Sequence, residues 1–301
     1  MVGTPGHDAA RRILLEKLGN SPLVPYSDRF ELPYRVAGNS FTNLLGLLPG
    51  SDLELPPLLL GAHYDTCGPL PGGDDNAAAV AILLAMIEPL RAAQLERSIV
   101  FAFFDAEEPP HFLTEAMGST HFYTHQRQGP IHCAVILDLV GHDVSIPGWE
   151  DLVFVSGVES DPGLRVPFQQ AADRAQDIRL LPTLTRYIGD MSDYHAFRLD
   201  ERPYLFFSCA QWPHYHERTD TPEKLNYAKM AALCATLTSI ATRLCGQALD
   251  GPFESHETTD LELDHLRTIA GPVASQLGLS LNTRADIDQL VPHLVSLLHG
   301  I

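Results

Sequence analysis

The sequence predicts an α/β fold with three layers (α/β/α), in which helices cover both faces of a mostly parallel, twisted central sheet. Two observations predict this fold. Short continuous apolar runs, typical of strands that are buried on both faces, alternate along the chain with longer stretches of helical periodicity. The chain also has 301 residues, 45% of them hydrophobic, which is enough to build a large core. Strands that alternate with helices form mostly parallel sheets with helices on both faces.

The predicted elements follow one another in a regular order. The strands are the apolar runs, and Pro222 suits the first position of the longest helix. The expected strands are residues 58–62, 98–104, 134–140 and 204–208, and the expected helices are residues 7–18, 76–90, 113–125, 162–174 and 222–244.

The composition changes after residue 244. Residues 250–260 carry Gly, Pro and acidic residues and are predicted to be a linker. Two helices are expected beyond it: residues 261–277, with a kink at Pro272, and a later amphipathic helix in which Pro292 is a potential break. We therefore predict a main domain over residues 1–249, and a linker with a helical appendage that has no chemistry of its own over residues 250–301.

Charge and apolar runs limit the partners of the chain. Acidic residues number 38 and basic residues 20, for a net charge of −18, so nucleic acids and anionic membranes are not expected partners. The longest apolar run, residues 77–87, is shorter than the roughly 20 residues that a membrane span needs. The N-terminal residues do not resemble a secretion signal and the five cysteines lack close pairs, so we expect a soluble, cytoplasmic protein. The sequence does not indicate an oligomeric state.

Two polar pairs lie just beyond predicted strands. His63 and Asp65 follow the first strand and point to the same side of an extended segment, as in a metal-binding histidine held by a carboxylate. Glu107 and Glu108 follow the second strand, so that one could bind a metal while the other acts as general base. A surface turn and an acidic loop are the alternative interpretations.

Three further groups are ambiguous when each is taken alone. Asp74 and Asp75 follow two glycines, and they would either approach a ligand or cap the following helix. Asp138 lies inside a predicted apolar strand, where a carboxylate needs a polar partner or a metal. His214 and His216 follow the last predicted strand, and at most one of them needs to be a ligand.

Taken together, these groups indicate a metal site. They lie at the ends of apolar strands or on a turn between two of them, and open α/β sheets bind their ligands at the carboxyl ends of the strands. Two histidines with three carboxylates suit two zinc ions that share one bridging carboxylate.

The residues of these motifs and their order along the chain resemble those of the co-catalytic zinc aminopeptidase family. Relatives of this family include glutamate carboxypeptidases, glutaminyl cyclases and transferrin-receptor-like domains. The resemblance extends from about His7 to Leu244. It rests on residues 61–65 (Gly-Ala-His-Tyr-Asp), 71–76 (Pro-Gly-Gly-Asp-Asp-Asn), 105–108 (Asp-Ala-Glu-Glu), 117–119 (Met-Gly-Ser), 137–138 (Leu-Asp), 192–193 (Ser-Asp) and 215–216 (Tyr-His), followed by Asp220-Thr221.

This resemblance implies a zinc-exopeptidase, phosphorylase/hydrolase-like fold, with residues 1–249 as the catalytic domain. It also implies two Zn²⁺ ions per chain. His63 and Asp138 would bind one ion, Glu108 and His216 would bind the other, and Asp75 would bridge both.

The resemblance implies catalytic roles for three further residues. Asp65 would orient His63, Glu107 would act as general base and then as general acid, and Tyr215 would help to stabilise the oxyanion. The expected protein is a metallopeptidase hydrolase, an aminopeptidase that cuts N-terminal bonds of a peptide or small amide substrate. Comparable turnover in a Glu107→Gln variant would contradict this assignment.

The chain departs from the family pattern in three places. The segment 109–116 is longer than in secreted aminopeptidases and is similar to an insert of glutaminyl cyclases. Tyr194 follows Asp193 where a histidine often stands, which leaves the role of His195 open. Cys67, four residues after His63, is interpreted as a loop residue rather than a ligand.

Three other functions remain open. One is a glutaminyl cyclase-like acyltransferase, which the insert favours. Another is a carboxypeptidase or amidohydrolase, in which Arg186 or Arg218 would hold a substrate carboxylate. The third is a binding module without activity, although such modules lose ligands and this chain retains them all.

Overall fold

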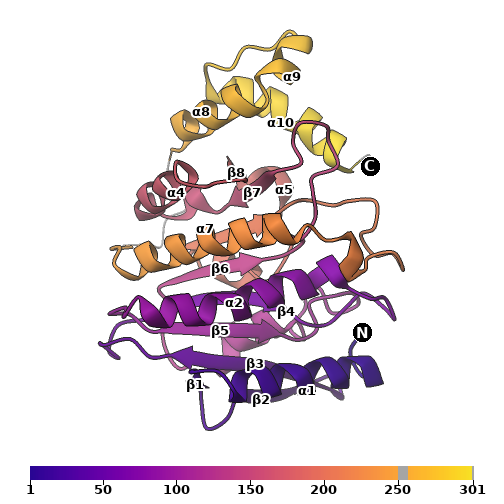
Figure 1. Cartoon of the computed structure of the whole chain (residues 1–301), viewed down its shortest axis with the longest axis vertical. Helices are drawn as coiled ribbons and strands as arrows, with labels where there is room; N and C mark the ends of the chain where they lie inside the picture. Colours follow the sequence, from indigo (N-terminus) through magenta and orange to yellow (C-terminus); the bar gives the residue numbers. More distant parts are fainter. Residues whose placement is uncertain (250–256, 300–301) are drawn as a thin grey trace.

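The computed structural model describes residues 1–249 and 257–299 of the chain. Within these residues nine strands form one sheet in the order β1-β3-β5-β4-β6-β9-β7-β8, and β2 pairs with β3 (Figure 1). The strands are β1 (Val24–Pro25), β2 (Glu31–Val36), β3 (Asn39–Leu48), β4 (Leu58–His63), β5 (Ile99–Phe104), β6 (Cys133–Leu137), β7 (Leu152–Ser156), β8 (Arg179–Thr183) and β9 (Tyr204–Ser208).

The predicted three-layer α/β fold is confirmed, and the sheet is mixed. The central strands β5, β4, β6 and β9 run parallel to one another, and so do β7 and β8. The pairings of β3 with β1, β2 and β5, and of β7 with β9, are antiparallel. The parallel centre brings the carboxyl ends of four strands to one edge of the sheet, where α/β proteins place their ligands.

Helices cover both faces of the sheet. The helices α1, α2, α4 and α7 lie against one face, and α6 and the helical segment Phe122–Gln126 that follows α3 lie against the other. The helices are α1 (Pro5–Gly19), α2 (Ala79–Ala92), α3 (Gly118–His121), α4 (Arg165–Ala172), α5 (Thr185–Ile188), α6 (His195–Leu199), α7 (Tyr227–Cys245), α8 (Thr259–Ile269), α9 (Gly271–Gln276) and α10 (Arg284–His299). None of the described helices is both long enough and apolar enough to cross a membrane.

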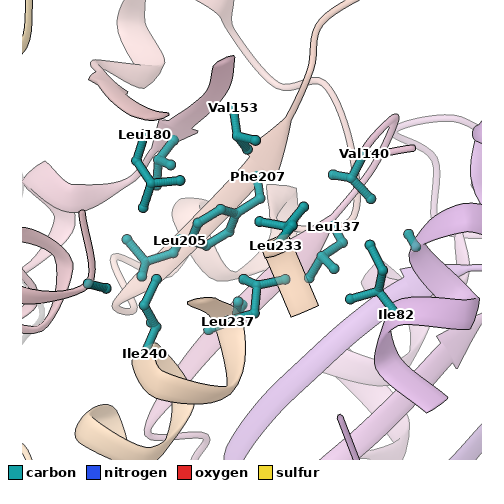
Figure 2. Packing of buried hydrophobic residues seen from close by; sticks show 14 of the residues in the cluster. Ile82, Leu137, Val140, Val153, Leu180, Leu205, Phe207, Leu233, Leu237 and Ile240 are labelled. Carbon is teal, nitrogen blue, oxygen red and sulfur yellow. The ribbon is translucent and has the colours of Figure 1, made fainter. Parts of the chain in front are cut away.

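The core consists of two apolar layers, one on each face of the sheet. Successive residues of the central strands enter opposite layers: Leu60 packs in the layer under α2 and α7, and Leu59 packs in the other layer. In Figure 2, Leu237 of α7 points toward Leu205 and Phe207 of β9. Burial on both faces explains why these strands are continuous apolar runs in the sequence.

The C-terminal helices extend the same core. Helix α8 packs against β8, and Leu261, Leu266 and Leu290 belong to the apolar layer that contains Leu180. In Figure 1, α8, α9 and α10 lie beyond β8, at one end of the sheet. Residues 250–256 of the predicted linker lie outside the described residues.

Several predicted boundaries were wrong, each for a local reason. The long helix begins at Tyr227, where the Asn226 side chain accepts the Lys229 N–H, and Pro222 begins a separate short turn. The strand predicted over 134–140 ends at Leu137, and Asp138 follows it. The helix predicted over 113–125 begins only at residue 118.

The two C-terminal prolines act differently. The kink expected at Pro272 is a break between α8 and α9, because Pro272 stands at the start of α9. Pro292, by contrast, lies within α10 without ending it.

Candidate metal centre

The candidate site lies at the carboxyl edge of the parallel strands. His63 is the last residue of β4, Asp138 directly follows β6, and the turn Gly73–Ala78 contains Asp75. Glu107 and Glu108 follow β5, and His216 lies in the loop after β9. The structure therefore brings together all five predicted ligands and Glu107.

The carboxylate of Asp75 faces two separate pairs of donors. Its Oδ1 atom lies 3.3 Å from Nε2 of His63, which is in turn 3.6 Å from Oδ1 of Asp138. Its Oδ2 atom lies 3.0 Å from Nε2 of His216, which is 3.1 Å from Oε2 of Glu108. Four ligands at zinc bonding distance are spaced about 3.3 Å apart, so both halves of the cluster match a zinc coordination shell.

Unpaired buried atoms support the same interpretation. The Nε2 atoms of His63 and His216 and the Oε1 atom of Glu108 are buried, and make no hydrogen bond within the described part of the chain. Buried polar atoms normally have a partner. A cation between them would satisfy these atoms and balance the carboxylates, so the donor set fits zinc.

Glu107 lies beside this cluster. Its Oε2 atom is 3.9 Å from Nε2 of His63, and its side chain is buried. Burial raises the pKa of Glu107 well above its ordinary value, against the opposing effect of His63, and the Asp138 carboxylate raises it further. A carboxyl group of raised pKa beside a metal cluster can accept and return a proton near neutral pH.

The histidines and carboxylates of the cluster shift one another's pKa values. Burial opposes the change, but contacts with Asp75 and Glu108 raise the pKa of His216 to about 10. Burial raises the pKa of Glu108 to about 7, although its contact with His216 lowers it. For Asp75, burial would raise the pKa, but the contacts with His216 and His63 outweigh it, and the pKa is lowered.

Asp65 connects His63 to the Glu107–Glu108 segment. One carboxylate oxygen of Asp65 accepts the backbone N–H of Glu107 at 3.0 Å and lies 3.4 Å from Nδ1 of His63. The other accepts the backbone N–H of Glu108 at 3.3 Å. Nδ1 of His63 also lies 3.2 Å from the backbone carbonyl oxygen of Asp65, so Asp65 orients the imidazole through its main chain and its carboxylate, and orients the acidic segment through its carboxylate.

Two residues that received no individual role from the sequence also position ligands. The carboxylate of Asp220 accepts the backbone N–H groups of Asp74 and Asp75, at 2.7 and 3.1 Å. The hydroxyl of Ser192 donates to Oδ2 of Asp138 at 2.7 Å. Both residues lie in motifs that carry the family resemblance, which was the only sequence signal for them.

Tyr215 stacks on His216, with ring centroids 3.8 Å apart, and lines the cavity beside the cluster. Burial raises the pKa of the Tyr215 hydroxyl, and the carboxylates of Asp75 and Asp138 reinforce this effect. The hydroxyl therefore stays protonated and can donate a hydrogen bond.

Three further residues singled out in the sequence lie at different places relative to the cluster. Cys67 lies nearer the cluster than expected, because its Sγ atom and donor atoms of Glu108 and His216 lie within 4.8 Å of one another. Asp193 is fully buried, and burial raises its pKa to about 7. His195 lies 2.8 Å from the carboxylate of Asp190 and is not part of the cluster.

A cavity of about 220 Å³ opens beside the cluster. Asp75, Glu107, Glu108, Asp138 and His216 line one side of it, and apolar side chains line most of the remainder. The site thus combines an acidic, metal-compatible wall with an apolar space.

A buried cluster of histidines and carboxylates at the carboxyl edge of a parallel sheet is typical of metal-dependent hydrolases. Residues 43–241 match the model of Peptidase family M28, and the chain belongs to this family.

Similar proteins agree with this family. The uncharacterized protein YfbL of Escherichia coli K12 is 26% identical over 228 residues, which are 65% of this chain and 69% of YfbL. Aminopeptidase YwaD of Bacillus subtilis is 27% identical over 103 residues, which are 33% of this chain and 22% of YwaD.

Solved structures share the fold. A glutaminyl cyclase of Macrostomum lignano has a TM-score of 0.63 at 19% identity, covering 82% of this chain and 85% of that one. BSAP, a zinc aminopeptidase from Bacillus subtilis, has a TM-score of 0.57 at 20% identity, covering 73% and 54%. Peptidases and cyclases thus both occur on this scaffold.

Proposed function

We propose that the protein is a zinc aminopeptidase that releases N-terminal residues from a peptide or small amide substrate. The observation that carries this proposal is the position of Asp75, whose two oxygens face two separate His–carboxylate pairs. Membership of Peptidase family M28 supports it.

The donor pairs define the proposed ligands of two zinc ions. His63 and Asp138 would hold one ion, Glu108 and His216 would hold the other, and Asp75 would be a ligand to both. Zinc bound there would polarise a carbonyl group and make a water molecule easier to deprotonate near neutral pH.

The remaining chemistry belongs to side chains beside the ligands. Glu107 accepts a proton from the attacking water and delivers it to the leaving amine, a role that its raised pKa favours. The hydroxyl of Tyr215 donates a hydrogen bond to the carbonyl oxygen, which becomes negatively charged as the carbonyl group is attacked. Asp65 contacts both His63 and the backbone N–H of Glu107, and so holds these two residues in a fixed position relative to each other.

The charge of the cavity favours an aminopeptidase over a carboxypeptidase. Among the described residues, no arginine or lysine lines the cavity, whereas several carboxylates do. Arg186 forms an ion pair with Asp288, and Arg218 is exposed. A carboxypeptidase needs a cationic side chain near the metal centre to hold the C-terminal carboxylate of its substrate, and the described lining of the cavity supplies none.

A glutaminyl cyclase-like acyltransferase is the second candidate, supported by the cyclases among the structural relatives. The test uses zinc-loaded protein and a pool of free and N-blocked peptides, some beginning with glutamine, followed by mass spectrometry. Trimming of only the unblocked peptides supports the aminopeptidase. Loss of ammonia from glutamine peptides without trimming supports the cyclase, and the Glu107→Gln protein serves as the inactive control.

We also propose that the chain divides into a catalytic domain, residues 1–249, and a linker with a C-terminal helical appendage, residues 250–301. A cytoplasmic location is also proposed. It is supported by the five cysteines, all of which are free thiols, as is usual in reducing compartments.

A further inference from the structure

The cavity beside the metal centre has a wall that lies outside the matched family region. The family match ends at residue 241, but side chains of α8 (Thr259–Ile269) and α10 (Arg284–His299) line the cavity. Leu266 of α8 and Val291, Leu294, Val295 and Leu298 of α10 line it.

The spacing of the α10 residues explains why they share one wall. Residues 291, 294, 295 and 298 repeat at the intervals of one helix face, and Val291, Leu294 and Leu298 are buried. Leu297, on another face of the same helix, is 48% exposed. Phe154, Leu181 and Phe206 of the sheet also line the cavity.

Polar contacts fix α10 in this position. Arg284 of α10 places its guanidinium 2.6 and 2.8 Å from the two carboxylate oxygens of Glu262 of α8. The Thr258 hydroxyl donates to the same carboxylate at 2.6 Å, so the charge of Glu262 is satisfied although it lines the cavity. The Tyr187 hydroxyl donates to Asp288 at 2.5 Å and links α10 to α5.

The size and chemistry of the cavity define its occupant. A closed apolar cavity of about 150 Å³ can bind benzene, and this one has about 220 Å³. We propose that α10 is a specificity element: its apolar face forms the far wall of a cavity that receives an apolar side chain, up to aromatic size, of the substrate's N-terminal residue. The assignment to that residue rests on the proposed aminopeptidase function.

The test changes residues on the cavity face of α10 and compares them with a control substitution on the exposed face of the same helix. Leu294→Trp fills the cavity, Leu294→Ala enlarges it, and Leu297→Ala makes the same Leu-to-Ala change on the exposed side of α10. Val295→Phe is a second filling variant, to be used if Leu294→Trp does not fold. Circular dichroism and the melting temperature establish that each variant is folded.

Kinetics with alanyl, leucyl and phenylalanyl anilides give the specificity. In the wild type we expect kcat/KM to rise about fourfold per buried methylene group. Leu294→Trp should lower kcat/KM for the phenylalanyl substrate tenfold or more relative to the alanyl substrate, and Leu297→Ala should leave this ratio unchanged. An unchanged ratio in both folded filling variants would overturn the proposal.

A binding measurement separates this inference from the aminopeptidase proposal. Straight-chain alkylamines from ethylamine to hexylamine are titrated calorimetrically into the zinc-loaded protein. Affinity should rise with chain length to a plateau, and the plateau should come at a shorter chain in Leu294→Trp but not in Leu297→Ala. If no anilide is cut but the plateau shifts, the result supports the role of α10 as a wall of the cavity and contradicts the aminopeptidase proposal. An identical plateau in all variants overturns the role of α10.

Discussion

His216 places its Nε2 atom 3.0 Å from Oδ2 of Asp75, although the two residues lie on separate loops. The other oxygen of Asp75 faces His63. One carboxylate therefore joins two donor pairs, and its removal should affect both metal sites.

Substitution of the bridging carboxylate should cost more metal than substitution of a ligand to one ion. We expect Asp138→Ala to retain about one zinc ion per chain, because Glu108, His216 and Asp75 remain. Asp75→Ala should retain less than one, because both ions lose a ligand. Zinc content after dialysis against a weak chelator, measured by mass spectrometry, tests this order. Equal retention in the two variants would contradict the bridging role.

Substitution of Glu107 should separate chemistry from metal binding. In Glu107→Gln the metal ligands remain but no carboxylate is left to carry the proton, so kcat should fall by about 10² to 10⁴-fold with unchanged zinc content. Steady-state kinetics and metal analysis of the same sample provide the comparison. Glu115→Gln, a change at an exposed glutamate in the following loop, should keep wild-type turnover.

The buried carboxylate of Asp105 should contribute strongly to stability. It lies 2.8 Å from Nε2 of His7 and accepts the backbone N–H of Thr42 at 2.7 Å, so it ties α1 and β3 to the end of β5. Asp105→Ala leaves both donors buried without a partner, and we expect a loss of about 3 kcal/mol in the free energy of unfolding. Urea denaturation measures it. Asp264→Ala, at an exposed site on α8, should change stability by less than about 0.5 kcal/mol.

Stability should decrease in acid partly through His132. Burial, reinforced by the charge of Arg97, lowers the pKa of His132 from 6.5 to about 4. The unfolded chain therefore binds more protons than the folded chain between these pH values, so this contribution is complete above pH 6.5 and is lost as the pH falls toward 4. Urea unfolding across this range should show a shallower pH dependence in His132→Gln than in the wild type.

The control for this pH experiment is His293→Gln, at an exposed position of α10. Its unfolding free energy should follow the wild-type pH dependence. Parallel curves for the wild type and His132→Gln would show that His132 does not contribute.

The four strands predicted from the sequence are all buried on both faces, although the largely buried strands β3 and β7 were not predicted. The segment 204–208 matches β9 because every residue there is buried, which leaves an uninterrupted apolar run. β2 was not predicted, because it is paired only with β3 at the border of the sheet, is partly exposed and contains Pro33. β8 likewise begins with Arg179 and contains Pro182. Such strands depend on their pairing partners more than on their own residues.

The metal site was predictable in its residue types but not in its geometry. Residue patterns alone did not distinguish His216 from His214; the structure does, because His216 alone reaches Asp75 while His214 contacts Thr219. The periodicity of α10 indicated a buried face. It contained no information on what that face meets, because the contact depends on how the whole chain returns to the cavity.

The path of α10 places two properties of the protein in different stretches of its sequence. All the proposed metal ligands lie between His63 and His216, within the family match, whereas the far wall of the cavity lies beyond it, between Val291 and Leu298. Under the proposed role of α10, part of the choice of substrate is encoded outside the stretch that carries the metal ligands, although Phe154, Leu181 and Phe206 of the same cavity lie inside it. Changes confined to the last helix would then alter substrate preference during evolution or engineering without touching the residues proposed to cleave the bond.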